Sequence, residues 1–371
     1  MSYSINTDTK TPIETAIPTE TLPTTNPLTG EKIYYLPANV THIPTPSAVK
    51  AIYMTKWVGS NAKSREKLVG IIDRTEINTV VIDVKDSSGK LSFEFVNPEI
   101  RKEGSSQNTI KDIGDFIKEL HSKNIYVIAR VAVFQDAYFA ERHPEYALKS
   151  KTTGELWKDA AKIHWLDAGS QDVWKYVTAI GAEAYNFGFD EINFDYIRYP
   201  SDGALKDIKY PASEGMAKSD VVTSFYKYLH DNIATTGVKI SGDIFGLTTT
   251  ETTDMGIGQL LISAATYFDY IDPMVYPSHY APGTYGYKNP STHPYEIVNF
   301  SMKKAVERLT AAGIDTQKIR PWLQDFNLLG VKYTAEMVRA QIKATNDNGL
   351  QSWMLWSAGN VYTESALEKA Q

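Results

Sequence analysis

The sequence predicts an α/β fold, a single (β/α)8 TIM barrel in which eight parallel strands alternate with helices. Apolar runs of strand length alternate with helical stretches from about residue 50 to the C-terminus. Four glycines each follow a helical stretch and precede a strand, where a left-handed residue ends a helix: Gly188, Gly237, Gly313 and Gly349. The alternative is an open, doubly wound sheet, but no glycine-rich phosphate-binding turn follows any strand.

Strands are expected where β-branched and aromatic residues gather between turn signals. They cover residues 51–58, 78–84, 125–134, 192–195, 239–245, 270–276, 319–326 and 351–356. Helices are expected where apolar residues recur at helical spacing. They cover residues 62–76, 110–123, 171–187, 219–235, 294–312 and 334–348, with a short closing helix after the last strand. Pro273 and Pro321 weaken the sixth and seventh strands, because proline cannot donate to a sheet.

The first 47 residues are rich in threonine and proline and are expected to form an extended leader. The barrel domain is expected to cover residues 48–371. A segment of this composition buries too little apolar surface to fold alone, so we expect the first 25 residues to be mobile.

Composition narrows the classes of function. The net charge is −6 and no basic stripe occurs, so a nucleic-acid partner is not expected. The absence of cysteine excludes thiol catalysis and disulfides. The seven histidines are scattered, so neither a metal nor another cofactor is expected. No apolar run reaches the length of a membrane span and the N-terminus lacks signal-peptide features. We expect a monomer at an extracellular or cell-surface location, exported by a signal outside this sequence.

The fourth predicted strand is the centre of the prediction. Ile192 and Phe194 alternate with Asn193 and Asp195, so the apolar pair should face helices and the polar pair the opposite side. A carboxylate inside a sheet needs a partner or a chemical task. Active sites of (β/α)8 enzymes lie at the C-terminal strand ends, which is where Asp195 falls. The structural alternative is a buried pair of Asp195 with Arg198.

The other predicted strand ends carry carboxylates, amides, tyrosines and tryptophans, a set that suits carbohydrate. Polar side chains can bond sugar hydroxyls, and aromatic rings can stack on the apolar faces of a sugar. The predicted partner is therefore an oligo- or polysaccharide. The candidate substrate-binding residues are Trp57, Asp86, Arg130, Asn193, Arg198, Asp272, Tyr276, His279, Trp322, Gln324, Asp325, Trp356 and Asn360.

Glycosidic cleavage needs two carboxyl groups, and Asp195 and Asp243 are the predicted catalytic pair. Neighbouring strands lie about 4.8 Å apart, which fits the roughly 5–5.5 Å between the carboxyl groups of retaining enzymes. Small and apolar neighbours should desolvate Asp243 and raise its pKa, as a general acid requires. The cation of Arg198 should keep Asp195 ionised. A structural role for Asp243 is the alternative, and Asp272 and Asp325 are rivals for the second role.

Two further residues are expected to support the site. Arg130 of the third strand should orient a catalytic carboxylate, and Asp272 should lie deeper in the barrel. Asp83 and Lys85 of the second strand are expected to form a buried ion pair without a catalytic part.

Long motifs stand at the predicted strand ends: DVKD (83–86), IARV (128–131), GFDEINFDYIRYP (188–200), GDIFG (242–246), DPMVYPSHY (272–280) and RPWLQDF (320–326). They resemble a largely uncharacterised family of bacterial glycoside hydrolase-like barrels, over about residues 50–360. The resemblance implies a TIM-barrel enzyme that hydrolyses O-glycosyl bonds, and it indicates the fold better than the substrate.

A weaker similarity concerns the fourth strand alone. Family 18 chitinases carry Asp-x-x-Asp-x-Asp-x-Glu there, which Asp190, Asn193 and Asp195 match in part. Ile197 stands where the catalytic Glu belongs, so this resemblance does not imply chitinase chemistry. In α-amylase-like barrels the nucleophile lies on the fourth strand and the acid on the fifth. These places resemble those of Asp195 and Asp243, although a Glu is usual at the second.

Two functions remain open at this point. The first is a retaining, endo-acting glycoside hydrolase of a microbial cell-surface or cell-wall polysaccharide, which uses the two aspartates. The second is a barrel that binds polysaccharide with the same residues but does not cleave it.

Overall fold

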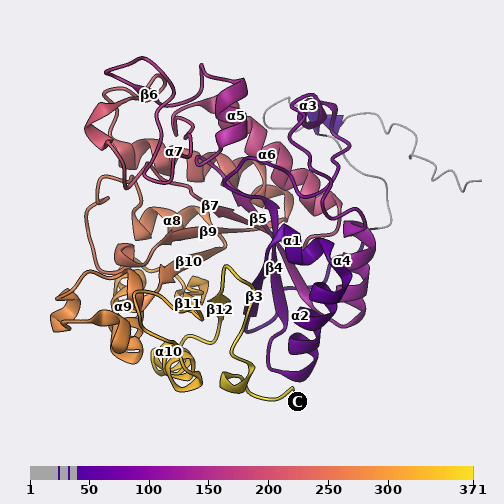
Figure 1. The fold of residues 1–371 in the computed structure, drawn as a ribbon, viewed down its shortest axis with the longest axis vertical. Coiled ribbons are helices and arrows are strands. Elements are labelled where there is room, and N and C mark those ends of the chain that lie inside the picture. The colour runs from indigo at the N-terminus through magenta and orange to yellow at the C-terminus, as the bar shows by residue number, and fades with distance from the viewer. Residues whose placement is uncertain (1–23, 26–31, 34–39, 371) are drawn as a thin grey trace, which may run out of the picture.

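The computed structural model describes residues 24–25, 32–33 and 40–370 (Figure 1). Eight parallel strands of this part of the chain close into a barrel in the order β3, β4, β5, β7, β9, β10, β11 and β12. Strand β12 pairs with β3 and completes the ring. Helices surround the strands on the outside (Figure 1). The predicted (β/α)8 barrel is confirmed.

The elements follow the chain in regular alternation. The barrel strands are β3 (Lys50–Met54), β4 (Thr79–Lys85), β5 (Tyr126–Ala132), β7 (Glu191–Asp195), β9 (Lys239–Phe245), β10 (Tyr270–Val275), β11 (Trp322–Gln324) and β12 (Trp353–Trp356). The helices are α1 (Lys56–Ser60), α2 (Ala62–Arg74), α3 (Pro98–Arg101), α4 (Ile113–Ser122), α5 (Ala137–Arg142), α6 (Gln171–Asn186), α7 (Lys218–Asn232), α8 (Leu261–Tyr267), α9 (Pro294–Ala311) and α10 (Ala335–Asp347). Two short antiparallel pairs complete the list: β1 (Thr24–Thr25) with β2 (Lys32–Ile33), and β6 (Lys149–Ser150) with β8 (Ile208–Lys209).

The first strand is shorter than predicted because a helix begins directly after it. The side chain of Thr55 accepts a hydrogen bond from the backbone N–H of Val58 and caps α1. The strand therefore ends at Met54, and Trp57 lies on a helix instead of at a strand end.

Other differences also follow from local chemistry. The seventh strand begins only at Trp322, since Pro321 has no N–H to give to a neighbouring strand. Helix α8, with seven residues, was not predicted, because it is too short to show a helical repeat. The expected closing helix is a single 3₁₀ turn, Glu364–Ala366.

The fourth strand of the barrel, β7, separates two differently filled spaces. Ile192 and Phe194 belong to the apolar layer between strands and helices, where Gly181 of α6 packs against them. A Cβ at Gly181 would lie only 3.2 Å from a side-chain carbon of Ile192, so helix and strand approach closely at this glycine. Asn193 and Asp195 lie on the other face, inside the barrel, where Asn193 donates to Asp243 and Asp195 accepts from Arg130. The predicted alternation is confirmed.

The four glycines expected to end helices all adopt the left-handed conformation. Their φ angles are 112° for Gly188, 96° for Gly237, 68° for Gly313 and 75° for Gly349. Such angles are costly for residues with a Cβ, which explains why glycine recurs at this place in the repeat.

Residues 43–45, part of the predicted leader, contact the N-terminal ends of the strands. The backbone N–H of Ile43 donates to Asp190 at 2.8 Å, and the hydroxyls of Thr45 and Tyr126 lie 3.0 Å apart. The first 23 residues, where most of the predicted mobile segment falls, lie outside the described residues, and the boundary at residue 48 stays a prediction. Within the described ranges, no helix has both the length and the apolar content to cross a membrane.

Candidate active site

A cavity of about 390 Å³ lies at the C-terminal ends of the strands, where the sequence predicts the site. Its wall contains part of the predicted set, namely Arg130, Asp195, Arg198, Asp243, Tyr276, His279 and Trp356. It also contains residues that were not predicted: Tyr196, Phe245, Gly246, Leu247, Met274 and Tyr280. Both predicted catalytic aspartates therefore border one cavity.

Asp195 is the last residue of β7, and both of its carboxylate oxygens are bonded. Oδ2 accepts from Nε of Arg130 at 3.1 Å and from Nη2 at 2.5 Å. Oδ1 accepts from the backbone N–H of Tyr196 at 2.6 Å. Tyr196 has a φ of 54°, a left-handed backbone that is costly for a residue with a side chain and that ends the strand here. The Asp195 carboxylate is thus held in one orientation.

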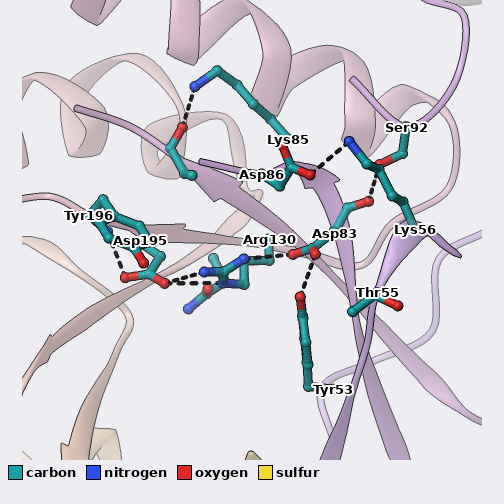
Figure 2. A network of polar contacts seen from close by, with 12 residues as sticks. Tyr53, Thr55, Lys56, Asp83, Lys85, Asp86, Ser92, Arg130, Asp195 and Tyr196 are labelled. Carbon is teal, nitrogen blue, oxygen red and sulfur yellow. Dashed lines mark hydrogen bonds and ion pairs between the residues drawn. The ribbon is translucent and has the colours of Figure 1, made fainter. Parts of the chain in front are cut away.

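Arg130 connects Asp195 to a second carboxylate, that of Asp83 on β4. Its Nη1 lies 2.6 Å from Oδ1 of Asp83, and the hydroxyl of Tyr53 donates to Oδ2 of Asp83. Figure 2 shows the guanidinium between the two carboxylates, with the hydroxyl of Tyr53 pointing to Asp83 from below. Because Asp83 and Tyr53 fix one side of the guanidinium, its other side is preorganised for Asp195.

The predicted ion pair between Asp83 and Lys85 is wrong. Nζ of Lys85 lies 2.7 Å from Oδ2 of Asp136, and both side chains are fully buried. The register between β4 and β5 shifts between residues 83 and 85, as at a β-bulge, so the two side chains do not share one face. The sequence pattern alone does not reveal such a bulge.

Asp243 lies in β9, and the register of β7 with β9 places it beside Asp195. Its Oδ1 accepts from Nδ2 of Asn193 at 2.9 Å and from Nε1 of Trp322 at 2.8 Å. Its Oδ2 bonds to no residue that the structure describes. Burial, followed by the charges of Asp195 and Asp272, raises the pKa of Asp243 well above its usual range. The predicted upward shift is confirmed.

A second cluster of an arginine and two carboxylates lies deeper in the barrel. Arg320 pairs with Asp272 through Nε at 3.1 Å and with Glu191 through both terminal nitrogens. All three side chains are fully buried. Burial raises the pKa of Asp272 to about 6, with the charge of Arg320 opposing this shift and that of Glu191 adding to it. Asn193 joins this cluster to the site, since its Nδ2 also lies 3.0 Å from Asp272.

The predicted partner of Asp195 is not the one that the structure shows. Asp195 pairs with Arg130, whereas Arg198 uses Nη1 to donate to the carbonyl of Tyr199 at 3.0 Å and to Ser201 at 3.3 Å. The structural alternative of an Asp195–Arg198 pair is therefore wrong. The left-handed residue after Asp195 ends the strand, so residue 198 no longer follows the strand alternation.

Several candidate residues contact protein instead of the cavity. Four are held by hydrogen bonds to neighbours: Trp322 to Asp243, Gln324 to Ser278, Asp325 to Thr363 and Asn360 to Thr55. Asn193 and Asp272 lie below the cavity wall, in the contacts described above.

Two further candidates lie outside the cavity. Trp57 is 63% exposed on α1. Asp86 pairs with Lys56 at 2.7 Å (Figure 2). Polar groups at strand ends thus serve here to fix the loops as well as to line the cavity.

Two of the unpredicted wall residues could have been identified from the alternation of residues along their strands. Phe245 lies two positions after Asp243, and Met274 lies two positions after Asp272, so strand alternation places each on the same face as a candidate. Tyr196 could not have been identified in this way, because no local sequence pattern indicates its left-handed conformation. In the described part of the chain, no three His, Asp or Glu side chains gather so that they could hold a metal ion.

Residues 51–362 match the family described as "Putative glycosyl hydrolase domain". The chain belongs to this glycosyl hydrolase family. Membership assigns its class of reaction, the hydrolysis of O-glycosyl bonds in a carbohydrate substrate, and confirms the resemblance found in the sequence. Among curated proteins, none matches the chain.

Two solved structures share the barrel fold of this chain, and a third is similar to it in sequence over half of its length. The glycoside hydrolase domain of PgaB (BpsB) from Bordetella bronchiseptica has a TM-score of 0.60 and 12% identity, over 84% of this chain and 95% of that one. The α-L-fucosidase isoenzyme 2 from Paenibacillus thiaminolyticus has a TM-score of 0.56 and 12% identity, over 86% and 48%. A hypothetical protein from Ruminiclostridium thermocellum ATCC 27405 is 33% identical over 52% of this chain and 96% of its own, with a TM-score of 0.48.

Proposed function

We propose that the protein is a retaining, endo-acting glycosidase of a microbial cell-surface or cell-wall polysaccharide, with Asp195 as nucleophile and Asp243 as general acid and base. One observation carries this proposal: two carboxyl groups on neighbouring strands border one cavity in opposite environments. Asp195 is paired with Arg130, whereas Asp243 is buried without a cation of its own and has a raised pKa. Carboxyl groups that differ in this way can supply a nucleophile and a proton donor at one pH.

In the first step, an oxygen of the Asp195 carboxylate attacks the anomeric carbon and forms a glycosyl–enzyme bond. The glycosidic C–O bond breaks, and the proton of Asp243 passes to the departing oxygen, which leaves as a hydroxyl group. Arg130 holds the Asp195 carboxylate during this step, so little of the binding energy is needed to orient the nucleophile.

In the second step, the ionised Asp243 takes a proton from water, and the water oxygen attacks the anomeric carbon. The bond to Asp195 breaks and its carboxylate is released, so the anomeric configuration has been inverted twice and is retained. Between the two steps Asp243 carries a charge, which the N–H groups of Asn193 and Trp322 stabilise at Oδ1.

The wall of the cavity suits a sugar ring. Tyr276 and Trp356 supply aromatic surface beside the two aspartates. Burial and the charges of Asp243 and Asp195 raise the pKa of Tyr276 well above its usual range, so its hydroxyl keeps a proton that it can donate. We assign the exposed Trp57 to a more distant sugar of a long chain, which fits endo-acting cleavage. The monomeric state and the extracellular or cell-surface location belong to the same proposal.

Labelling of the nucleophile tests the proposal directly. The protein is incubated with a series of 2-deoxy-2-fluoro glycosides that carry an activated leaving group, and its peptides are analysed by mass spectrometry. We expect one sugar to remain bound to Asp195, because the fluorine slows the second step more than the activated first step. In parallel, proton NMR of fresh digests of bacterial polysaccharides should show the retained anomer first. A label on another carboxylate, or an inverted first product, would contradict the proposal.

A further inference from the structure

Arg198 lies in the cavity wall with most of its hydrogen-bonding capacity unused. The side chain is only 8% exposed, and its contacts through Nη1 are with neutral groups, the carbonyl of Tyr199 and the hydroxyl of Ser201. Its Nε and Nη2 donate to no residue in the described ranges. No carboxylate of the described residues lies within ion-pair distance of the guanidinium, and Asp195 pairs with Arg130 instead.

Aromatic rings hold this guanidinium in place. The guanidinium carbon lies 4.5 Å from the ring centre of Phe245, 5.0 Å from that of Trp165 and 5.5 Å from that of Tyr196. Contacts with aromatic rings stabilise the cation but do not satisfy its N–H groups. Burial lowers the pKa of Arg198, and the charges of nearby carboxylates, that of Asp195 first among them, oppose this shift without forming an ion pair. A buried cation ordinarily has an anionic partner.

We propose that Arg198 binds an anionic group of the substrate, a carboxylate or a phosphate, and that the substrate is therefore an acidic polysaccharide. The inference rests on the proposed glycosidase function, because Arg198 and Asp195 line the same cavity. The charged group then belongs to a sugar at or next to the cleaved bond. The planar fork of N–H donors in arginine fits both carboxylate and phosphate.

Two other roles would give different results. If Arg198 acts only through its charge on Asp195, its loss should affect acidic and neutral substrates equally. If it only packs between the aromatic rings, its loss should lower stability without changing the preference among substrates. An anion-binding role changes the preference itself.

The experiment compares matched substrates. A uronate-containing polysaccharide is used before and after reduction of its carboxyl groups, and a phosphate-bearing polymer of the teichoic-acid type before and after removal of its phosphate. We expect the unchanged protein to prefer one charged form over its neutral counterpart by about 10- to 100-fold in kcat/KM, the range of a hydrogen bond to a charged group. The pair that shows the preference identifies the anion. Arg198→Gln should bring this ratio close to one, and Arg198→Lys should restore part of it.

Arg142→Gln is the control, since Arg142 also lies over an aromatic ring, that of Tyr138, but does not line the cavity. This variant should keep the substrate preference. Binding of the same oligosaccharides to Asp195→Asn, measured by calorimetry with and without Arg198→Gln, separates the inference from the proposed function. Binding of acidic ligands that depends on Arg198, without hydrolysis by the unchanged protein, would uphold the inference and refute the glycosidase proposal. Equal losses on charged and neutral forms, or no preference and no binding, would overturn the inference.

Discussion

The barrel contains two clusters at different depths, each made of one arginine and two carboxylates. In the upper cluster, Arg130 bridges Asp83 and Asp195. In the lower cluster, Arg320 bridges Glu191 and Asp272. In each cluster one guanidinium holds two carboxylates by charge-assisted hydrogen bonds, and only the upper cluster reaches the cavity.

The two clusters differ in whether a substrate in the cavity can reach them. Arg130 and Asp195 line the cavity, whereas the side chains of Arg320, Glu191 and Asp272 are all completely buried. A sealed arginine with its carboxylates can fix neighbouring strands, but it cannot touch a substrate. An ion pair inside a barrel is therefore a catalytic candidate only where one of its carboxylates also borders the cavity. Residue type alone does not separate the two.

Asp243 lies between the two clusters and belongs to neither. Asn193 donates to it from the same amide nitrogen that lies near Asp272, and no cation pairs with it among the residues described. Full burial and the charges of two neighbouring carboxylates therefore raise the pKa of Asp243, and the charge of Arg130, which forms no ion pair with Asp243, opposes this shift only in part. This is the arrangement that a proton donor requires.

One matched substitution in each cluster should distinguish their roles, and the change in turnover should be the strongest predicted here. Asp195→Asn should reduce turnover at least about 1,000-fold, since an amide cannot form the glycosyl ester. It should cost less stability than a change in the lower cluster, because Asp195 and Arg130 border the cavity. Glu191→Gln in the lower cluster should instead lower the free energy of unfolding by about 3–5 kcal/mol, because it removes the negative charge from a fully buried ion pair with Arg320. Its turnover per folded molecule should stay within a few-fold. Kinetics and urea unfolding of both variants check this.

Two results would contradict this assignment of a structural role to the lower cluster and a catalytic role to the upper one. If Glu191→Gln loses turnover at unchanged stability, the lower cluster takes part in the chemistry. If Asp195→Asn keeps its turnover, the nucleophile lies elsewhere. Asn and Gln match the shapes of the original side chains, so neither result would reflect a lost volume.

The second prediction concerns the proton of Asp243. Asp243→Asn should reduce turnover on substrates with poor leaving groups by about 100- to 10,000-fold, the usual contribution of a general acid. The loss should be much smaller with an activated leaving group, and azide should then accelerate the variant. Because the first step needs the protonated form, kcat/KM of the unchanged protein should fall as pH rises through the raised pKa of Asp243. This alkaline limb should be absent in Asp243→Asn. Near-normal activity of the variant would show that Asp243 is not the proton donor, and neither Asp272 nor Asp325, the earlier rivals, lines the cavity to replace it.

Much of this arrangement could be predicted from the sequence, because it depends on local periodicity. Alternation along β7 places Asp195 inside the barrel, and the order of the strands places Asp243 on the next strand. The small and apolar sequence neighbours of Asp243 predicted that burial raises its pKa, whereas the contributions of the Asp195 and Asp272 charges were not predicted.

The partners of the charged residues could not be predicted in the same way. Arg130, Lys85 and Asp83 choose their partners through the register of strands that are far apart in sequence and through a shift in that register. The rotation of Arg198 away from Asp195 depends on one left-handed residue, and a short capped helix moves Trp57 out of its predicted strand. These features depend on tertiary contacts and on single backbone angles, which hydrophobic periodicity does not encode.

The last prediction, with the weakest effect, concerns the lower cluster and the pH dependence of the free energy of unfolding. The pKa of Asp272 is about 6 in the folded protein, against about 3.9 for an aspartate in an unfolded chain. A carboxyl group with a raised pKa stabilises the folded state fully below about pH 4, and this contribution is lost as pH rises through about 6. The free energy of unfolding should therefore contain a component that falls between pH 4 and pH 7, by about 1–3 kcal/mol.

Asp272→Asn should remove this component, because an amide does not titrate in this range. The quantity to measure is the difference in unfolding free energy between the two proteins in urea at several pH values. This difference should change in favour of the variant as pH rises from 4 to 7, whatever the constant cost of altering the contact with Arg320. A difference that does not depend on pH would show that Asp272 stays ionised beside Arg320 throughout. The lower cluster would then resemble the upper one in charge as well as in composition, and access to the cavity would be the one remaining distinction.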